Sequence, residues 1–533
     1  MVHFNRRMMI KGSLTAAGLS LLGACGQNRK PAVGPEPHKS GRTAAEVMKR
    51  ATTFMHERCA HRGGYVWSYA ADFSRRWGEM EAYPTMIWIQ PPGTATVGHL
   101  FLDCYHATGD VYYYEVATDI AAGLVDAQHP AGGWNYLHDF AGAASTQRWY
   151  DTIGKNGWRL EEFHHYYGNA TFDDSGTAEA AQFFLRLFLE RREERYREPL
   201  ELALGYMLDS QYENGGWPQR FPFVADRPVL HGRPDYTRHI TFNDDVAAEN
   251  IKCLLMVWQT LGDRRALDAV KRAMNVFVMT QHPAPQAGWG LQHDAETLRL
   301  VGARSYEPEA LATDATAGNI AMLLDFYEWT AEPRFLTRLP EAFDWLESVR
   351  LDADEVRVKG REFPTFVEIG TNRALYNHRR GSNVVNGEYY HDYNPDNPIA
   401  HSSQWRQIDL SSLRSRYETL QGVSARVLRE ESPLNRRQQF ELPRFFAPHH
   451  PSDMQVETLI ATLNREGYWP TPLTFTSHPY LGDGPGTPVP GDYSQTFVGD
   501  DSDTSPYRTS TPEIGISTRT FIWNMATLMQ VAG

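Results

Sequence analysis

Two pairs of adjacent aspartates each stand directly before an apolar helical run. They are Asp173-Asp174 and Asp244-Asp245. One aspartate is enough to cap a helix, because its oxygen accepts a free backbone N–H at the helix start. The second carboxylate repels the first unless a cation or a cationic substrate group lies between them. Clusters that offer only oxygen atoms suit calcium or magnesium, and simple helix capping is the alternative for either pair.

The aspartate pairs belong to a longer repeat. Apolar residues recur at i, i+3, i+4 and i+7 in segments 97–104, 180–187, 251–258 and 320–327, and each segment is predicted to be a helix with one buried face. Second helices follow the first and third segments after matching Gly-Asp turns. Repeats of this size indicate stacked helical hairpins, and we predict an α/α toroid with long loops and short strands. The aspartate pairs should then converge at one mouth of the ring.

A glycine-tryptophan loop also recurs, at Trp134, Trp217 and Trp289. Aromatic rings exposed on glycine loops suit stacking against sugar rings. Packing in the core is an equally good interpretation of each tryptophan.

Composition and charge exclude some classes of protein. The chain has 533 residues, of which 41% are hydrophobic and 12% aromatic, which is typical of a globular protein. Its formal net charge of −13 argues against a nucleic-acid binder. The negative net charge does not exclude an acidic sugar polymer as a substrate, because a local arginine cluster or a bound cation can offset that charge at the binding site.

The first residues form a targeting segment. A twin-arginine start at Arg6-Arg7 is followed by a short apolar stretch, and the residues Leu22 to Cys25 resemble the lipobox of bacterial lipoproteins. We therefore expect residues 1–25 to be a signal, residues 26–40 a linker, and the mature protein a periplasmic or outer-membrane lipoprotein of a bacterial envelope. An ordinary cleaved signal is the alternative.

Five motifs then occur in a specific order, and together they resemble the pectate lyases of polysaccharide lyase family ten. The resemblance implies an α/α toroid that cleaves polygalacturonate by calcium-assisted β-elimination and releases unsaturated oligogalacturonides. It covers about residues 41–420, which we expect to be the catalytic domain. Residues 421–533 have no clear counterpart in the family and are expected to form a C-terminal extension packed on or covering the toroid, and we expect a monomer. The motifs are TFDD at 171–174, NGGWPQ at 214–219, ITFNDD at 240–245, ARSYE at 303–307 and GTNR at 370–373.

The resemblance assigns roles to individual residues. Arg304 is the candidate base and Asp173 a second catalytic residue, while Asp174, Asp244 and Asp245 are the candidate calcium ligands. Free arginine is always protonated, so burial and a nearby cation must favour the neutral form of Arg304. The alternative for Arg304 is a salt bridge to Glu307 within the same motif.

Further motif residues are candidates for binding the substrate. Arg373 is expected to hold a carboxylate through both arms of its guanidinium, and Arg220, Asn243, Trp217 and Tyr306 are expected to contact the sugar chain. Position 174 departs from the family pattern, because it is Asp where the family usually has Asn. This departure adds a charge to the predicted metal site.

Two other functions stay open. A glycoside hydrolase on the same toroid would act on uronic-acid oligosaccharides with two carboxylates as acid and base, for which Asp174 and Asp245 are candidates. A non-catalytic lipoprotein would capture sugar oligomers with its tryptophan loops. A lyase leaves an unsaturated, ultraviolet-absorbing end, a hydrolase leaves saturated ends, and a binding protein leaves the polymer intact.

Overall fold

A computed structural model shows how the predicted elements are arranged. The predicted signal, lipobox and linker lie outside the residues that it describes. The described residues are 43–154, 160–225, 227–230, 232–380, 388–396, 398–399, 404–435, 442, 444–473 and 512–532.

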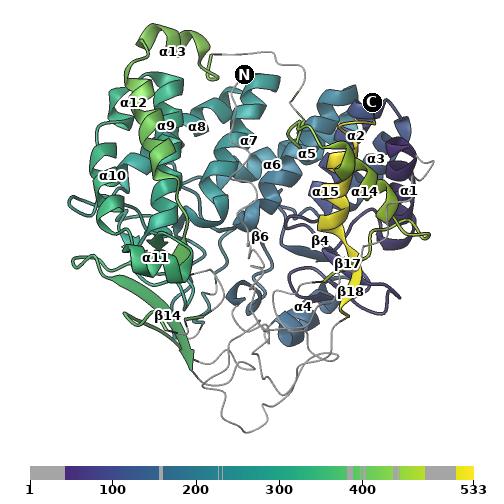
Figure 1. Cartoon of the computed structure of the whole chain (residues 1–533), viewed down its shortest axis with the longest axis horizontal. Coiled ribbons are helices and arrows are strands. Elements are labelled where there is room, and N and C mark those ends of the chain that lie inside the picture. The colour runs from purple at the N-terminus through teal and green to yellow at the C-terminus, as the bar shows by residue number, and fades with distance from the viewer. Residues whose placement is uncertain are drawn as a thin grey trace, which may run out of the picture.

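Repeated helical hairpins dominate the fold, as the sequence predicts, and Figure 1 shows them side by side in an arc. In the first part of this arc α2 contacts α5, and α5 contacts α7. The fold is therefore an α/α toroid with long loops and short strands. The hairpins are α2 (Thr94–Thr108) with α3 (Val111–Ala127), α5 (Gly176–Arg191) with α6 (Arg197–Asp209), α7 (Val246–Leu261) with α8 (Arg264–Met279), and α9 (Thr313–Thr330) with α10 (Leu339–Ser348).

The Gly-Asp turns explain why two of these hairpins bend where they do. Gly109 and Gly262 end α2 and α7 in the left-handed region, with φ of 71° and 72°, which glycine adopts without steric cost. The next residues, Asp110 and Asp263, then cap α3 and α8 by accepting a backbone N–H at 3.0 and 2.8 Å.

The three loop tryptophans lie in the core. Trp134, Trp217 and Trp289 are fully buried, and each indole N–H donates to a backbone carbonyl of a preceding helix at 2.8 to 2.9 Å. Sugar rings cannot reach them in this arrangement. The expectation that Trp217 stacks against the substrate is therefore wrong, because its glycine loop turns the ring inward.

Short antiparallel strand pairs join the hairpins at the end where the aspartate turns lie. The longest strands follow α9, where β14 (Ala374–Arg380) pairs with β15 (Glu388–Asp392). The other pairs are β4 (Met86–Trp88) with β5 (Leu137–Asp139), β6 (Ala170–Thr171) with β7 (Arg220–Phe221), β9 (Gln292–His293) with both β8 (Ile240–Thr241) and β10 (Leu300–Val301), β13 (Phe366–Val367) with both β11 (Leu311–Ala312) and β14, and β12 (Phe363–Pro364) with β16 (Trp405–Arg406).

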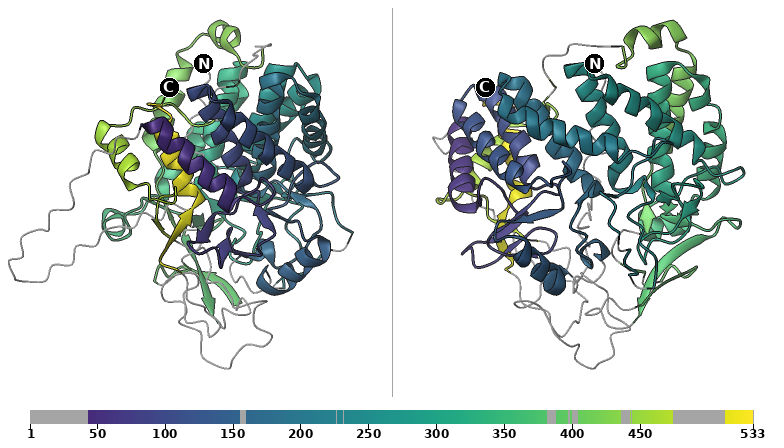
Figure 2. Two further views of the ribbon diagram at one scale, coloured as in Figure 1. Left: turned by 90° about the vertical axis from the view of Figure 1, so that its right-hand side faces the viewer. Right: turned by 180° about the vertical axis from the view of Figure 1, so that it is seen from behind.

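The two ends of the described chain meet. Figures 1 and 2 show α15 (Thr518–Leu528) and α14 (Asp453–Thr462) beside α1 (Ala44–Phe54), and α15 also contacts α2. In the five-stranded sheet of this region, β18 (Ile514–Ser517) lies between β17 (Thr471–Pro472) and β1 (Ser68–Ala70), and β2 (Arg76–Trp77) and β3 (Glu81–Ala82) continue the sheet.

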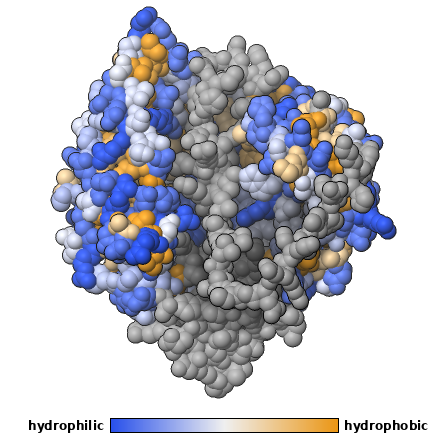
Figure 3. Space-filling model, in the orientation of Figure 1, coloured by the Kyte–Doolittle hydropathy of each residue, from blue (hydrophilic) through white to orange (hydrophobic). Residues whose placement is uncertain are grey.

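The remaining helices are not part of the four hairpins. On the face shown in Figure 3 the described surface is mostly hydrophilic, with hydrophobic residues scattered among the polar ones. No helix in the described ranges has the length and apolar character needed to span a bilayer. Helices α12 (Leu410–Gln421) and α13 (Ala425–Glu431) contact α9. Helices α4 (Ala143–Trp149) and α11 (Ala353–Lys359) have seven residues each, as α13 does.

Candidate active site

The two aspartate turns have the same local structure. After β6 the chain makes the 3-10 turn Asp173–Ser175 and enters α5, and after β8 it makes the turn Asn243–Asp245 and enters α7. Neither helix start has a side-chain capping hydrogen bond. The alternative that the aspartates serve only as helix caps is therefore excluded.

Left-handed backbone at the same two positions of each turn sets the direction of the side chains. Asp174 and Ser175 have φ of 52° and 64°, and Asp244 and Asp245 have φ of 53° and 56°. Aspartate tolerates this region better than most residues. The two turns contact each other, so the aspartate pairs converge as the repeat predicts.

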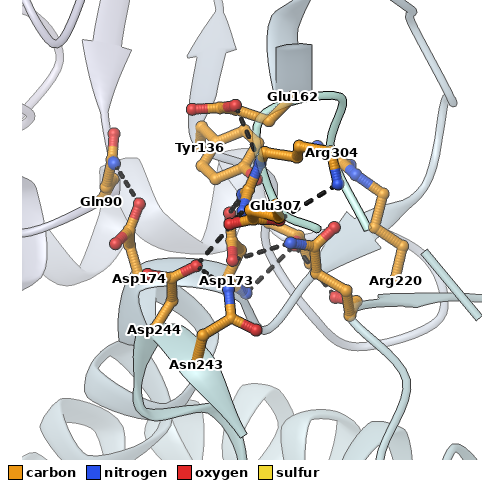
Figure 4. A network of polar contacts seen from close by, with 12 residues as sticks. Gln90, Tyr136, Glu162, Asp173, Asp174, Arg220, Asn243, Asp244, Arg304 and Glu307 are labelled. Atoms are coloured by element: carbon orange, nitrogen blue, oxygen red, sulfur yellow. Dashed lines mark hydrogen bonds and ion pairs between the residues drawn. The ribbon is translucent and has the colours of Figure 1, made fainter. Parts of the chain in front are cut away.

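Arg304 lies at the centre of this convergence, and four carboxylates surround its guanidinium (Figure 4). Its Nη2 is 2.8 Å from Asp173 Oδ2, and its Nη1 is 3.0 Å from Glu307 Oε1. Its Nε is 3.2 Å from Glu162 Oε2, and Nη1 is also 3.5 Å from Asp244 Oδ2. Arg304 is only 5% exposed.

This environment holds Arg304 in its charged form. Burial by itself would lower the pKa of Arg304, but Glu307, Asp173 and the other neighbours together raise it well above its usual value. The salt bridge to Glu307 that the sequence offered as an alternative is therefore present. A role as a base requires that at least one of these carboxylates be engaged elsewhere.

Asp173 is the most strongly held of the four carboxylates. Its Oδ2 accepts a hydrogen bond from the Tyr136 hydroxyl at 2.5 Å, and its Oδ1 accepts one from Gln219 Nε2 at 2.8 Å. Burial would raise the pKa of Asp173, but Arg304 and these hydrogen bonds hold it below its usual value. Asp173 is therefore a fixed anion that orients Arg304.

The pKa values of Asp174 and Asp244 shift in the opposite direction to that of Asp173. They lie side by side in Figure 4, and burial together with neighbouring carboxylates raises the pKa of both well above the usual range. The Asp244 side chain keeps 32% of its surface exposed. Asp245 lies on the exposed side of its turn, so Asp174 and Asp244 form the more enclosed pair.

The donor atoms fit a hard cation, although they do not form a complete metal site. In the ranges that the structure describes, no three His, Cys, Asp or Glu side chains are arranged to hold a metal ion. The oxygens of Asp174 and Asp244, and the buried Asn243 Oδ1 that has no hydrogen-bond partner, are chemically suited to calcium. Calcium takes six to eight oxygen ligands, so substrate and water would supply the rest.

Arg220 is a second buried guanidinium near this network. Its Nη1 donates to Asn135 Oδ1 and Asn169 Oδ1 at 3.2 and 3.3 Å, and its Nε and Nη2 have no hydrogen-bond partner. The rings of Tyr136 and Tyr167 lie 4.9 and 5.0 Å from it. A buried cation without a hydrogen-bonded anion is unfavourable, so this position favours a negatively charged group.

The other predicted substrate-binding residues lie at different depths. Tyr306 is buried, with its hydroxyl 3.5 Å from Glu162 Oε2. Arg373 is in an exposed turn between β13 and β14, and its guanidinium lies 3.3 Å from the Tyr393 ring centre. Among the described residues, Arg373 has no hydrogen bond or ion pair with the cluster around Arg304.

Three residues of the cluster were not predicted from the sequence. Gln219 belongs to the NGGWPQ motif, and Glu162 forms a pair of adjacent carboxylates with Glu161. A motif and a carboxylate pair are the same two patterns that pointed to the aspartates. Tyr136 had no such signal, because the pairing of β4 with β5 brings it to Asp173.

Comparison with known proteins identifies a family. A model of the pectic acid lyase family matches residues 128–393, which include both aspartate turns, Arg304 and Arg373. No curated protein matches the chain.

Solved structures give a weaker likeness. A family 10 polysaccharide lyase from Cellvibrio cellulosa has 16% identity and a TM-score of 0.41, over 63% of this chain and 94% of that one. A mutant of that lyase, solved with trigalacturonic acid, has the same identity and score. A GH76 α-mannanase from Bacteroides thetaiotaomicron has 10% identity and a TM-score of 0.33, over 92% of this chain and 96% of that one.

Proposed function

We propose that this chain, a member of the pectic acid lyase family and thus a polysaccharide lyase, cleaves polygalacturonate by calcium-assisted β-elimination and releases unsaturated oligogalacturonides. One observation carries the proposal. Three motif segments, those of Asp173, Asp244 and Arg304, meet in a single cluster of charged side chains. These segments are the ones whose family resemblance assigns them to the reaction.

The reaction breaks two bonds of one uronate ring and forms one double bond. The C5–H bond breaks as a base takes the proton, the C4–O4 bond breaks with its electron pair on the leaving oxygen, and a C4=C5 double bond forms. Calcium bound to the substrate carboxylate would stabilise the negative charge that develops next to C5. Asp174 and Asp244 would hold that ion, and their protons must leave when their oxygens take up a cation.

Arg304 is the candidate base, and its contacts indicate which atom acts. Its 3.5 Å contact with Asp244 is the longest of the four. Asp244 is also the most exposed of the four carboxylates, so Nη1 faces the open side of the cluster. When Asp244 is engaged elsewhere, Nη1 loses its contact with that carboxyl group. Asp173 keeps its hold on Nη2 and fixes the direction of Nη1.

Two arginines are candidates for holding substrate carboxylates. Arg220 offers unpartnered N–H groups next to the cluster, which supports a subsite close to the reacting ring. Arg373 is exposed, which supports a more distant contact with the polymer.

Product analysis on polygalacturonate tests the proposal. We expect unsaturated, ultraviolet-absorbing ends to accumulate, to stop with a calcium chelator and to return with added calcium. Saturated ends would instead indicate the hydrolase, and an intact polymer would indicate the binding protein. Full activity in chelator would remove calcium from the mechanism.

Arg304→Lys tests the base. Lysine keeps the charge but loses the planar fork and the reach of the guanidinium. We expect kcat to fall by about two to four orders of magnitude, as when a general base is removed, while the polymer still binds. Near-normal kcat would leave Arg304 with its salt bridge to Glu307 as its only role.

We also propose that the mature protein is a lipoprotein of a bacterial envelope, beginning at a lipid-modified Cys25. Mass spectrometry of the mature N-terminus tests this, and an unmodified start further along the chain would exclude it.

A further inference from the structure

Gln90 is a buried glutamine whose amide can adopt only one orientation. It follows β4 and is 3% exposed. The indole N–H of Trp88 donates to Gln90 Oε1 at 2.8 Å. An indole N–H is only a donor, so the oxygen of the amide must face Trp88 and the nitrogen must point the other way.

That nitrogen holds two carboxylates. Gln90 Nε2 donates to Asp174 Oδ2 at 2.6 Å and to Glu79 Oε2 at 2.8 Å (Figure 4 shows the first contact). An amide nitrogen has two hydrogens, so each is used once. Two acidic side chains are thereby held next to each other through a neutral donor.

We propose that Gln90 is a positioning residue of the calcium site, which fixes the direction of the Asp174 carboxylate. This inference rests on the proposed function. It extends the site to the segment that carries Gln90 and Glu79, which precedes the matched residues 128–393. Ligand carboxylates commonly need a hydrogen-bond donor behind them to hold their orientation.

Among the described residues, the hydrogen bond from Gln90 is the contact that holds the Asp174 carboxyl group in one direction. The backbone conformation of Asp174 fixes only its Cα–Cβ bond, so without Gln90 the carboxyl group would be free to rotate. A neutral amide holds the carboxylate in place without adding a charge.

The backbone of Gln90 is held by the same strand pair that serves the other aspartate. Its N–H donates to the Tyr136 carbonyl at 3.3 Å, and its carbonyl accepts from the Trp67 indole at 2.9 Å. Tyr136 in turn donates its hydroxyl to Asp173. The β4–β5 pair thus presents one donor to each aspartate of the first turn.

The test compares Gln90→Met with Gln128→Met. Methionine keeps the length of the side chain and removes both polar ends. Gln128 is the matched control, because its Nε2 also serves two acceptors, the carbonyls of Gly132 and Pro199 at 2.7 and 2.9 Å. The measurements are the calcium Kd by calorimetry and the Asp174 side chain in crystals of both variants.

We expect Gln90→Met to weaken calcium binding about 10- to 100-fold and to let the Asp174 carboxylate leave its single orientation. Gln128→Met should change neither, even where it lowers Tm. The proposal would be overturned if Gln90→Met left both the calcium Kd and the orientation of the Asp174 carboxylate unchanged. It would also be overturned if both variants lost the same amount of calcium affinity. If the unaltered chain binds no calcium, the metal in the proposed function fails, and so does the role of Gln90 in a calcium site. The crystals then report only whether Gln90 orients Asp174.

Discussion

The turn and helix at 171–191 and those at 241–261 have nearly the same backbone and different chemistry. Each begins with a two-residue strand ending in Thr, continues through a left-handed turn, and enters a helix of 16 residues that ends on a left-handed residue. The first turn has Asp173 where the second has Asn243. Asp173 holds Arg304 at 2.8 Å, whereas Asn243 donates to Asp244 at 2.6 Å.

This difference shows how a repeat acquires a function. The repeated backbone brings equivalent side chains together, and one carboxylate-to-amide difference makes the charges unequal. The pKa of Asp173 is held low, while the pKa values of Asp174 and Asp244, which occupy equivalent positions, are raised. The first turn therefore supplies a fixed anion, and each turn supplies one carboxylate that can bind a cation.

Asp173→Asn removes the difference, and we expect the largest effect from it. Arg304 loses its best-held partner, so kcat should fall by about two to four orders of magnitude. Steady-state kinetics measures this, with far-ultraviolet circular dichroism as the check on folding. A folded variant that keeps near-normal kcat would show that the difference between the turns has no catalytic consequence.

Asp244→Asn and Asp174→Asn compare the two equivalent aspartates. Calcium affinity depends on the number of charged ligands, so we expect Asp244→Asn to raise the calcium concentration for half-maximal activity by about tenfold or more. Asp174→Asn removes the same charge from the first turn, so we expect an increase of the same order. A much smaller effect of Asp174→Asn would mean that the two turns contribute unequally to the metal.

Glu179 and Glu249 extend the comparison into the helices, because they lie at the same place in α5 and α7. Burial raises the pKa of Glu179 to about 7 from 4.5, although a hydrogen bond from Thr96 opposes this. Glu249 instead forms an ion pair with Lys252 at 3.0 Å.

The raised pKa of Glu179 predicts a pH-dependent stability. The folded state keeps the proton that the unfolded state loses above pH 4.5, so the stabilisation is complete below pH 4.5 and disappears as pH rises to about 7. At about 1.4 kcal/mol per pKa unit the loss approaches about 3 kcal/mol. Glu179→Gln should therefore flatten the change in Tm between pH 5 and 8. Glu249→Gln should leave the change in Tm with pH as it is in the unaltered protein. If Glu249→Gln flattened that change and Glu179→Gln did not, the pH dependence would not come from Glu179.

Asp245→Ala should have the smallest effect. Asp245 is exposed and corresponds to Ser175 in the first turn, where no carboxylate is present. We expect the calcium requirement to change by less than about threefold, on the scale of exposed charges. A large increase, measured in the same titration as for Asp244→Asn, would restore Asp245 as a ligand.

The sequence predicted the parts of the fold that depend on local pattern. Apolar spacing predicted the repeated helices, and the ordered motifs predicted that Asp173, Asp244 and Arg304 belong together. The burial of Trp217 could not be predicted, since a glycine loop allows the ring to face either way. Tyr136 and Gln90 were missed because strands of three residues, β4 and β5, position them, and such short strands leave no periodic signal.

The charge state of Arg304 could not be predicted from the sequence either. The expectation of a lowered pKa followed from the role that the resemblance assigns, whereas the structure surrounds the side chain with Glu162, Asp173, Asp244 and Glu307. Only Glu307 is a neighbour in the chain. The other three come from distant segments, so their combined field appears only in the folded protein.

The pairing of β18 with β1 constrains the order in which the chain can fold during synthesis. Ser68 lies opposite Ser517, so the sheet that contains β2 and β3 stays incomplete until almost the whole chain has left the ribosome. Until then β1 exposes an unpaired edge, which is a template for aggregation, and α1 and α2 lack the cover of α15. A product that ends before residue 514 should therefore aggregate even though every catalytic candidate is present.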